Sequence, residues 1–377
     1  MRRTAYLVVT LALAALAVGC TGQGASAPAE PTGPRPYLAD ADAHGYLTYD
    51  PRTQALTGYT RDGTRRWQRE SVDPYEVHCV LTCPDAVISL RPKDSGEAGT
   101  TAAPTAAEAG APTAGSTGDP GVLWIAGTAA TPAGGADTKI HWAASREDWI
   151  GSTPTELLIS NRGNITGTPL KNSASALFRL SPDGTSAMVS TPVGTTPESG
   201  WSGQSVEIGK DGPKMGRAIA SIPGPIGCWN PDGTRMVTLG KNPTVVSASD
   251  GTPAAGLSAE FASECTSGPS GITVGEYRPS LEGNTGQATL FDGNSFRRMS
   301  ASNRLTDASG FKPAGPCVAF TQHGRVGFMN PADGAVKSTG IQGVDTWKAG
   351  AGDLWALHPD GRAELVPVGP ENCPPAG

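Results

Sequence analysis

The sequence lacks the short motifs that mark several classes of enzyme and metal site. None of its five histidines begins a His-Glu-x-x-His motif, and no Gly-x-Ser-x-Gly segment is present. Neither a metalloprotease site nor a hydrolase built on that serine turn is therefore indicated. Charged residues make up only 17% and form no basic cluster, which with a net charge of −6 argues against a nucleic-acid partner. The sequence predicts no catalytic, cofactor-binding or metal-binding residue. The histidines are His44, His78, His141, His323 and His358.

Long apolar runs are absent except at the N-terminus. Residues 5–18 are uncharged and apolar apart from Thr10, and they follow the basic residues Arg2 and Arg3. Such a run is too short to span a bilayer comfortably and has the shape of a signal peptide. The export route stays open.

The end of this run, Leu16-Ala17-Val18-Gly19-Cys20, resembles the lipobox of bacterial lipoproteins. Ala17 stands where that family usually has leucine. The resemblance implies that residues 1–19 are a lipoprotein signal peptide and that Cys20 is acylated and becomes the mature N-terminus. The chain would then be anchored by lipid to the outer face of the cytoplasmic membrane, in the cell envelope. The alternative is an ordinary secretory signal with a cysteine at its end.

Two further stretches lack large apolar residues. Residues 20–36 form a Gly-, Ala- and Pro-rich tether behind the lipidated cysteine, and residues 94–120 are dominated by Ala, Thr, Gly, Pro and Glu. Neither stretch can bury enough apolar surface to fold by itself. The second stretch separates two strand-like segments, 86–90 and 122–126, so we expect a low-complexity loop inserted into one folded domain over residues 37–377.

The cysteines that follow Cys20 are even in number. In an exported protein an even set indicates up to three disulfides, whose connectivity the sequence leaves open. Nearest-neighbour pairing is our prediction. A metal at Cys79 and Cys83 would need a second ligand pair that is missing, and Asp40-Ala41-Asp42 begins like a calcium loop that lacks its final Glu. The disulfide candidates are Cys79, Cys83, Cys228, Cys265, Cys317 and Cys373.

Turn-forming residues are what the chain has in abundance, with 50 Gly and 33 Pro. Residues 226–239 read as a strand, a Pro231-Asp232-Gly233 turn and a returning strand. The same pattern recurs at Asp183-Gly184 and Asp360-Gly361, and with one inserted residue at Asp333-Gly334. Several Asp-Gly pairs lie 41 to 49 residues apart, a spacing typical of propeller repeats.

The first unit, residues 37–70, resembles one blade of quinoprotein-like β-propellers, and the Pro-Asp-Gly-Thr units resemble blades of TolB-type (WD40-like) propellers. These resemblances imply an all-β domain with about seven four-stranded blades, six or eight being possible. Quinoprotein dehydrogenases typically carry an adjacent Cys-Cys pair, which is missing here, so no cofactor is expected.

A propeller fold alone assigns no activity. Our first hypothesis is a lipid-anchored binding or scaffold module at the cell envelope, with a protein or envelope polymer as its partner and no assigned catalysis. The second is a propeller enzyme (hydrolase, lyase or oxidoreductase) at the central axis. Inward-pointing carboxylates or histidines within hydrogen-bonding reach there would favour it. A solute-binding lipoprotein is a third possibility, but the helices alternating with parallel strands that it needs are missing.

Overall fold

The computed structural model describes residues 35–91, 121–127, 129–133, 137–170, 175–194, 200–268, 271–280, 283–302, 305–306, 308–343, 345–348 and 353–375. Residues 34–377 form one compact unit, to which the following description applies. The predicted signal peptide, Cys20, nearly all of the tether and the insertion at 94–120 lie outside the described residues.

The described chain is a series of antiparallel sheets in which strand order follows chain order. The first four sheets are β1 (Tyr37–Ala41), β2 (Gly45–Asp50), β3 (Ala55–Thr60) and β4 (Arg65–Arg69); β5 (Pro74–Cys79), β6 (Ala86–Leu90), β7 (Val122–Ala126) and β8 (Ala129–Ala133); β9 (Lys139–Ala143), β10 (Trp149–Ser152), β11 (Glu156–Asn161) and β12 (Asn164–Pro169); and β13 (Leu177–Leu180), β14 (Ser186–Pro192), β15 (Trp201–Gly209) and β16 (Gly212–Ile222).

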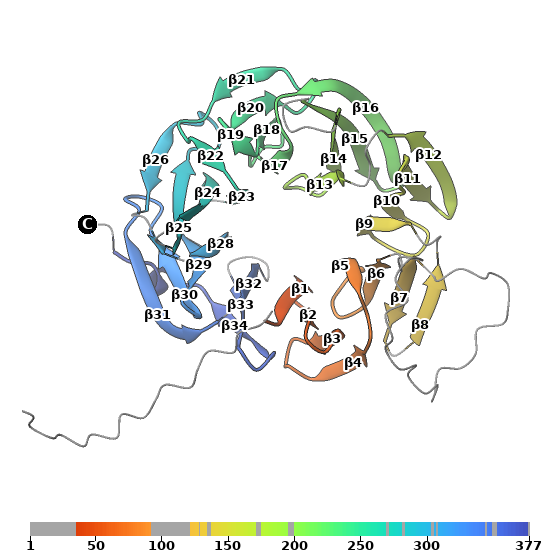
Figure 1. Cartoon of the computed structure of the whole chain (residues 1–377), viewed down its shortest axis with the longest axis horizontal. Helices are drawn as coiled ribbons and strands as arrows, with labels where there is room; N and C mark the ends of the chain where they lie inside the picture. Colours follow the sequence, from red (N-terminus) through yellow and green to blue (C-terminus); the bar gives the residue numbers. More distant parts are fainter. Residues whose placement is uncertain are drawn as a thin grey trace, which may run out of the picture. The chain divides into compact units, whose positions relative to one another are not determined.

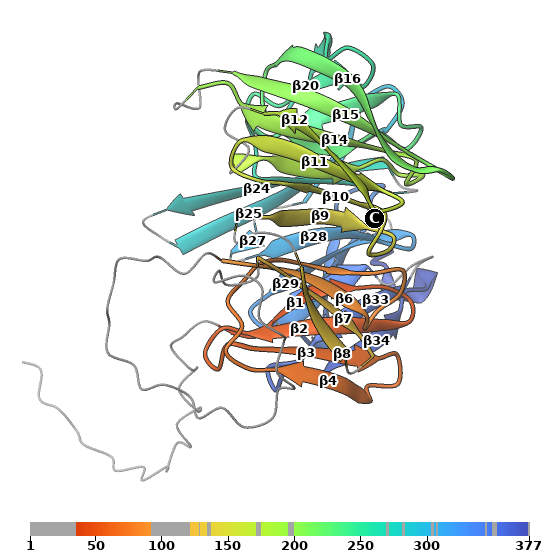
Figure 2. The same ribbon diagram turned by 90° about the vertical axis from the view of Figure 1, so that its right-hand side faces the viewer.

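The later sheets vary more in strand number. They are β17 (Ile226–Trp229), β18 (Arg235–Thr238), β20 (Thr244–Ser247) and β21 (Pro253–Gly256), with the small pair β19 (Gly240–Lys241) and β22 (Phe261–Ala262); β23 (Glu264–Gly268), β24 (Gly271–Ser280), β25 (Gly283–Phe291) and β26 (Arg298–Ala301), with β27 (Leu305–Thr306) on β25; β28 (Ser309–Ala314), β29 (Cys317–Gln322), β30 (Arg325–Met329) and β31 (Val336–Gln342); and β32 (Asp345–Lys348), β33 (Asp353–Leu357) and β34 (Ala363–Pro367). The β24–β25 hairpin extends beyond the neighbouring strands (Figure 2). A short 3₁₀ turn, η3 (Pro370–Asn372), follows β34.

The sheets are the blades of a β-propeller, as the sequence predicts (Figure 1). The first strand of each blade lies innermost, and β1 contacts both β5 and β32, which closes the ring. Among the described residues seven blades have four strands or more, which confirms the expected number of about seven. The three-stranded sheet β32–β34 stands between β28–β31 and β1–β4 as a further, shorter blade. No α-helix occurs in the described ranges.

The repeated turns have the predicted backbone. Gly184, Gly233 and Gly361 have φ of 71°, 74° and 86°, where glycine is favoured because it has no Cβ. In each turn the glycine N–H donates to the carbonyl three residues earlier, and the aspartate accepts the N–H two residues later. The turns are therefore equivalent in structure as well as in sequence.

The core lies between adjacent blades, since each sheet buries both faces against its neighbours. Trp229 and Trp355 are among the large side chains buried in these interfaces. Both tryptophans therefore pack between blades.

Three disulfides join Cys79 to Cys83, Cys228 to Cys265 and Cys317 to Cys373, the same pairs that nearest-neighbour pairing predicts. Cys228 and Cys265 lie on β17 and β23, so their bond connects the innermost strands of two successive blades. The bond at Cys373 ties the C-terminal segment to β29. None of the helices described is long and apolar enough to cross a membrane.

Candidate functional site on the innermost strands

The carboxylates on the innermost strands connect one blade to the next. The innermost strand of a blade has an edge whose N–H groups have no strand partner. Asp40 on β1 accepts the Cys79 N–H at 2.7 Å, Glu264 on β23 accepts the Phe311 N–H at 3.2 Å, and Asp345 on β32 accepts the Leu38 N–H at 2.9 Å. These three carboxylates therefore have a structural role.

The apparent calcium loop has the same explanation. Asp42 accepts the N–H groups of His44, Gly45 and Cys83, so its oxygens hold the β1–β2 turn and the disulfide-closed loop after β5. Burial raises the pKa of Asp40, while the nearby His78 and the backbone N–H groups act in the opposite direction. The described residues contain no cluster of three or more groups that could hold a metal ion.

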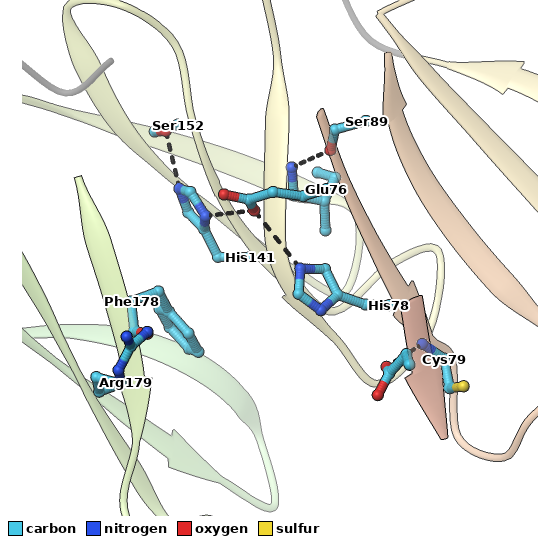
Figure 3. Close-up of polar contacts among 10 residues, drawn as sticks. Glu76, His78, Cys79, Ser89, His141, Ser152, Phe178 and Arg179 are labelled. Atoms are coloured by element: carbon cyan, nitrogen blue, oxygen red, sulfur yellow. Dashed lines mark hydrogen bonds and ion pairs between the residues drawn. The ribbon is translucent and has the colours of Figure 1, made fainter. Parts of the chain in front are cut away.

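Glu76 on β5 is different, because it binds histidines instead of backbone N–H groups (Figure 3). Its Oε2 lies 2.8 Å from Nδ1 of His141 on β9 and 3.5 Å from Nε2 of His78. The Nε2 atom of His141 lies 2.9 Å from Oγ of Ser152 on β10. A continuous polar chain thus joins two blades, and its members are separated by up to 76 positions in the sequence.

The charge of Glu76 fixes the direction of its hydrogen bond with His141. Burial acts to raise the pKa of Glu76, but hydrogen bonds and charge from His141 and His78 outweigh it and lower the pKa to about 2. An ionised carboxylate only accepts, so Nδ1 of His141 carries a proton. When the imidazole is neutral, Nε2 accepts the hydroxyl proton of Ser152; in the imidazolium both ring nitrogens donate and the Ser152 Oγ accepts.

His141 is held rigidly in this position. Its side chain is 2% exposed, and its ring stacks on Phe178 of β13 at 5.9 Å with an angle of 10° between the planes. Alongside, Ser89 Oγ accepts the Ile140 N–H at 2.7 Å, which fixes β9 against β6. The histidine therefore connects three successive blades.

Glu76 and its neighbour Arg179 keep unused hydrogen-bonding capacity. Among the described residues Oε1 of Glu76 has no hydrogen-bond partner, and its side chain is 26% exposed. Arg179 on β13 donates from Nε to Gly227 O and from Nη1 to Phe178 O, which leaves Nη2 without a partner in the same described set. Burial lowers the pKa of Arg179, and the charge of Glu76 acts to raise it. An acceptor and a donor thus lie within electrostatic range of one another.

The order Ser152–His141–Glu76 is that of a nucleophile, a base and an orienting acid. The hydroxyl, however, belongs to a residue on β10 that is only 1% exposed. A substrate carbonyl cannot reach Ser152 in this conformation, whereas Glu76 and His78 are open to solvent. The arrangement as it stands can bind a polar group but cannot deliver the serine to a substrate.

Little in the sequence indicates this site. His78 and His141 stand apart from the other histidines in the sequence, and Glu76, Ser152 and Arg179 belong to no motif. A weak signal existed in retrospect, because an acidic residue and a histidine alternate along the strand Pro74–Cys79. Of the disulfide candidates, Cys79 is adjacent to His78 on β5 and is bonded to Cys83, whereas the other two disulfides lie on other blades. Cys20 lies outside the described residues.

Comparison with known proteins supports the fold and reaches no further. The sequence matches no protein-family model and no curated protein. A computationally designed protein, Ika8, has a similar structure with a TM-score of 0.56 at 7% identity, covering 88% of this chain and 95% of that one. BamB from Moraxella catarrhalis gives a TM-score of 0.52 at 12% identity, covering 87% and 95%. A putative TolB from Agrobacterium tumefaciens matches 61% of this chain and 90% of its own, with 16% identity and a TM-score of 0.34. The likenesses to Ika8 and BamB, at these low identities, show a shared fold alone.

Proposed function

We propose that this protein is a lipid-anchored, extracytoplasmic β-propeller that binds a partner at the cell envelope through its innermost strands. The observation that carries the proposal is the pair of unused groups, Oε1 of Glu76 and Nη2 of Arg179, held by rigid strands and reachable by solvent. Together they suit a partner that offers both donors and acceptors, such as the amides of a protein segment or the hydroxyls of an envelope polymer.

Lipid anchoring rests on the sequence around Cys20. The proposed anchor would hold the propeller outside the cytoplasmic membrane, in an oxidising environment where its three disulfides persist. Cys20→Ala should leave the protein uncleaved or soluble. Unchanged mature mass and unchanged partition into the detergent phase in that variant would contradict the anchor.

Capture of partners from the protein's own cell envelope, followed by mass spectrometry, tests the binding site. Glu76→Gln removes the charge but keeps the shape, so we expect it to lose the partner that the wild type retains. The matched control is Glu207→Gln, which removes an exposed carboxylate on β15. A partner retained equally by both variants would show that Glu76 is not part of the binding surface.

A hydrolase is the second candidate, and the Ser152–His141–Glu76 order specifically favours it. It requires an opening of β9 from β10 that exposes the serine. Labelling of Ser152 by a fluorophosphonate, abolished in Ser152→Ala and in His141→Gln, would support the hydrolase over the binding module. We expect no labelling of the folded protein, because the serine is buried.

A further inference from the structure

A second site lies away from the axis, where the sheets β5–β8 and β9–β12 meet. A pocket of about 430 Å³ opens there, next to the outer parts of both blades. The apolar cluster between these two blades supplies Val122, Trp124, Ile140 and Trp149 to its lining. Its volume falls within the range of roughly 300–1,000 Å³ that is common for small-molecule sites.

The walls of the pocket are apolar. Trp124 of β7 and Trp149 of β10 are 5% and 8% exposed, and Ile140 and Leu158 continue the lining between them. Ile165 of β12, at the rim, is 60% exposed, which is high for a large aliphatic side chain. Buried aromatic walls with an exposed aliphatic rim suit an apolar ligand body that enters from solvent.

The rim also carries a positive charge, the guanidinium of Arg146. Arg146 is exposed, and its Nη2 donates to Thr131 Oγ1 at 3.1 Å. Among the described residues it has no other hydrogen bond and no carboxylate partner. The neighbouring Ser160 hydroxyl is already used, because it donates to Glu147 O at 2.7 Å. Arg146 is thus the charged group with donors left for a ligand at this rim.

We propose that this inter-blade pocket binds a free anionic amphiphile, a single apolar chain ending in a carboxylate. The chain lies against Trp124, Trp149 and Leu158, and the carboxylate pairs with the Arg146 guanidinium. Guanidinium and carboxylate match in geometry and form charge-assisted hydrogen bonds. This site is independent of the innermost-strand site and of the partner proposed for it.

Calorimetric titration with three probes of one chain length tests the proposal. The probes are decanoate, decanol and decyltrimethylammonium, used below their aggregation concentrations, with the unlipidated chain from residue 21 onward. We expect decanoate to bind at one site more tightly than decanol, and decyltrimethylammonium not to bind. Equal binding of all three would overturn the proposal, because it would reflect apolar adsorption only.

Charge variants at the exposed rim keep the test independent of folding. Arg146→Gln should weaken decanoate binding about tenfold, the worth of a hydrogen-bonded charge. Arg146→Glu should reverse the preference in favour of decyltrimethylammonium. The matched control, Arg298→Gln on β26, removes an exposed arginine from a distant blade and should change nothing. Decanoate binding that is unaffected by Arg146→Glu would overturn the assignment.

Filling the pocket gives a second measurement. Leu158→Trp should abolish decanoate binding while the far-ultraviolet circular dichroism stays that of the wild type. Retained binding in the folded variant would contradict the site.

Sedimentation with phosphatidylglycerol vesicles distinguishes a free anionic amphiphile from the anionic headgroup of a membrane lipid. Arg146-dependent sedimentation without decanoate binding would overturn the proposal, because the ligand would then be a membrane headgroup.

Discussion

Two carboxylates in this propeller have a pKa lowered to about 2, and they reach it in different ways. Asp183 sits in an exposed turn, where hydrogen bonds from the side chains of Ser181 and Thr185 and from the Thr185 N–H lower its pKa. Glu76 lies on an innermost strand, and it overcomes the cost of burial through two histidines, one of them on another blade. The first environment is local and repeated, whereas the second exists once and depends on the ring.

The comparison predicts which substitutions should destabilise the protein little and which should destabilise it more. All partners of Asp183 lie within two residues of it, so the turn can form before the blades pack. The partners of Glu76 are fixed only when β5, β9 and β10 are in place. Substitutions in the turns should therefore cause modest losses of stability that are similar from one turn to the next. Substitution of Glu76 should cause a larger loss that no other site reproduces.

The largest loss of stability is expected at His141, the partner of Glu76 on another blade. His141→Ala removes a hydrogen bond to an ionised carboxylate and another to a buried hydroxyl, and it leaves a cavity beside Phe178. The free energy of unfolding should fall by about 3 kcal/mol in urea denaturation. His44→Ala, which truncates an exposed histidine, is the control and should change stability little. Equal losses in both variants would show that the polar chain contributes nothing.

Smaller, matched losses are expected at the turn glycines. A Cβ added at Gly184, Gly233 or Gly361 would meet nothing within 4 Å, so replacement by valine is opposed by backbone strain alone. Each Gly→Val change should cost roughly 1–3 kcal/mol in denaturant unfolding. Gly334→Ala should exceed Gly233→Ala, because its Cβ would collide with the carbonyl of Ala301. Unlike costs among the first three glycines would disprove the equivalence of the turns.

The dependence of stability on pH tests the lowered pKa of both carboxylates. The folded pKa of Glu76 is about 2, below its ordinary 4.5, so its contribution to stability is present above pH 4.5 and lost as the pH falls towards 2. Asp183 loses its contribution similarly between 3.8 and about 2. Glu76→Gln and Asp183→Asn should each flatten that part of the pH–stability curve, measured by thermal unfolding.

Added salt should change the contributions of these two carboxylates to stability by different amounts. At pH 3 added salt should weaken the contribution of Glu76, which relies partly on histidine charge, and leave that of Asp183 nearly unchanged because its partners are neutral hydroxyl and N–H groups. An equal response of both carboxylates to salt would contradict the distinction between a local and a tertiary origin.

The smallest effect is expected from shortening the insertion at 94–120. The strands on either side are already joined, since Leu90 N–H donates to Gly121 O at 2.8 Å and Ser89 pairs with Val122. Loop closure changes by only ~0.6 kcal/mol per halving of loop length. Replacement by a short Gly-Ser turn should leave the melting temperature within about 2 °C, and a drop beyond about 10 °C would show that the insertion packs against the propeller.

Much of the fold follows from local patterns. The predicted strands 86–90 and 122–126 coincide with β6 and β7, because apolar and β-branched residues between turn formers have few other stable conformations. The blade number was harder to predict. The three-stranded sheet β32–β34 and the additional strand β27 depend on which segments find an edge to pair with, and spacing between turns does not determine that.

The turns, the strands and the all-β class can be predicted from the sequence, because they depend on interactions between residues a few positions apart. The contact of Glu76 with His141, the links that Asp40, Glu264 and Asp345 make between blades, and the position of Arg146 beside an apolar pocket follow from the packing of the blades. Ring closure brings together strands from distant parts of the chain, and a pairing across 65 residues leaves no spacing or motif to detect. The environment of such a group, and with it its pKa and its possible ligand, exists only after the blades have packed.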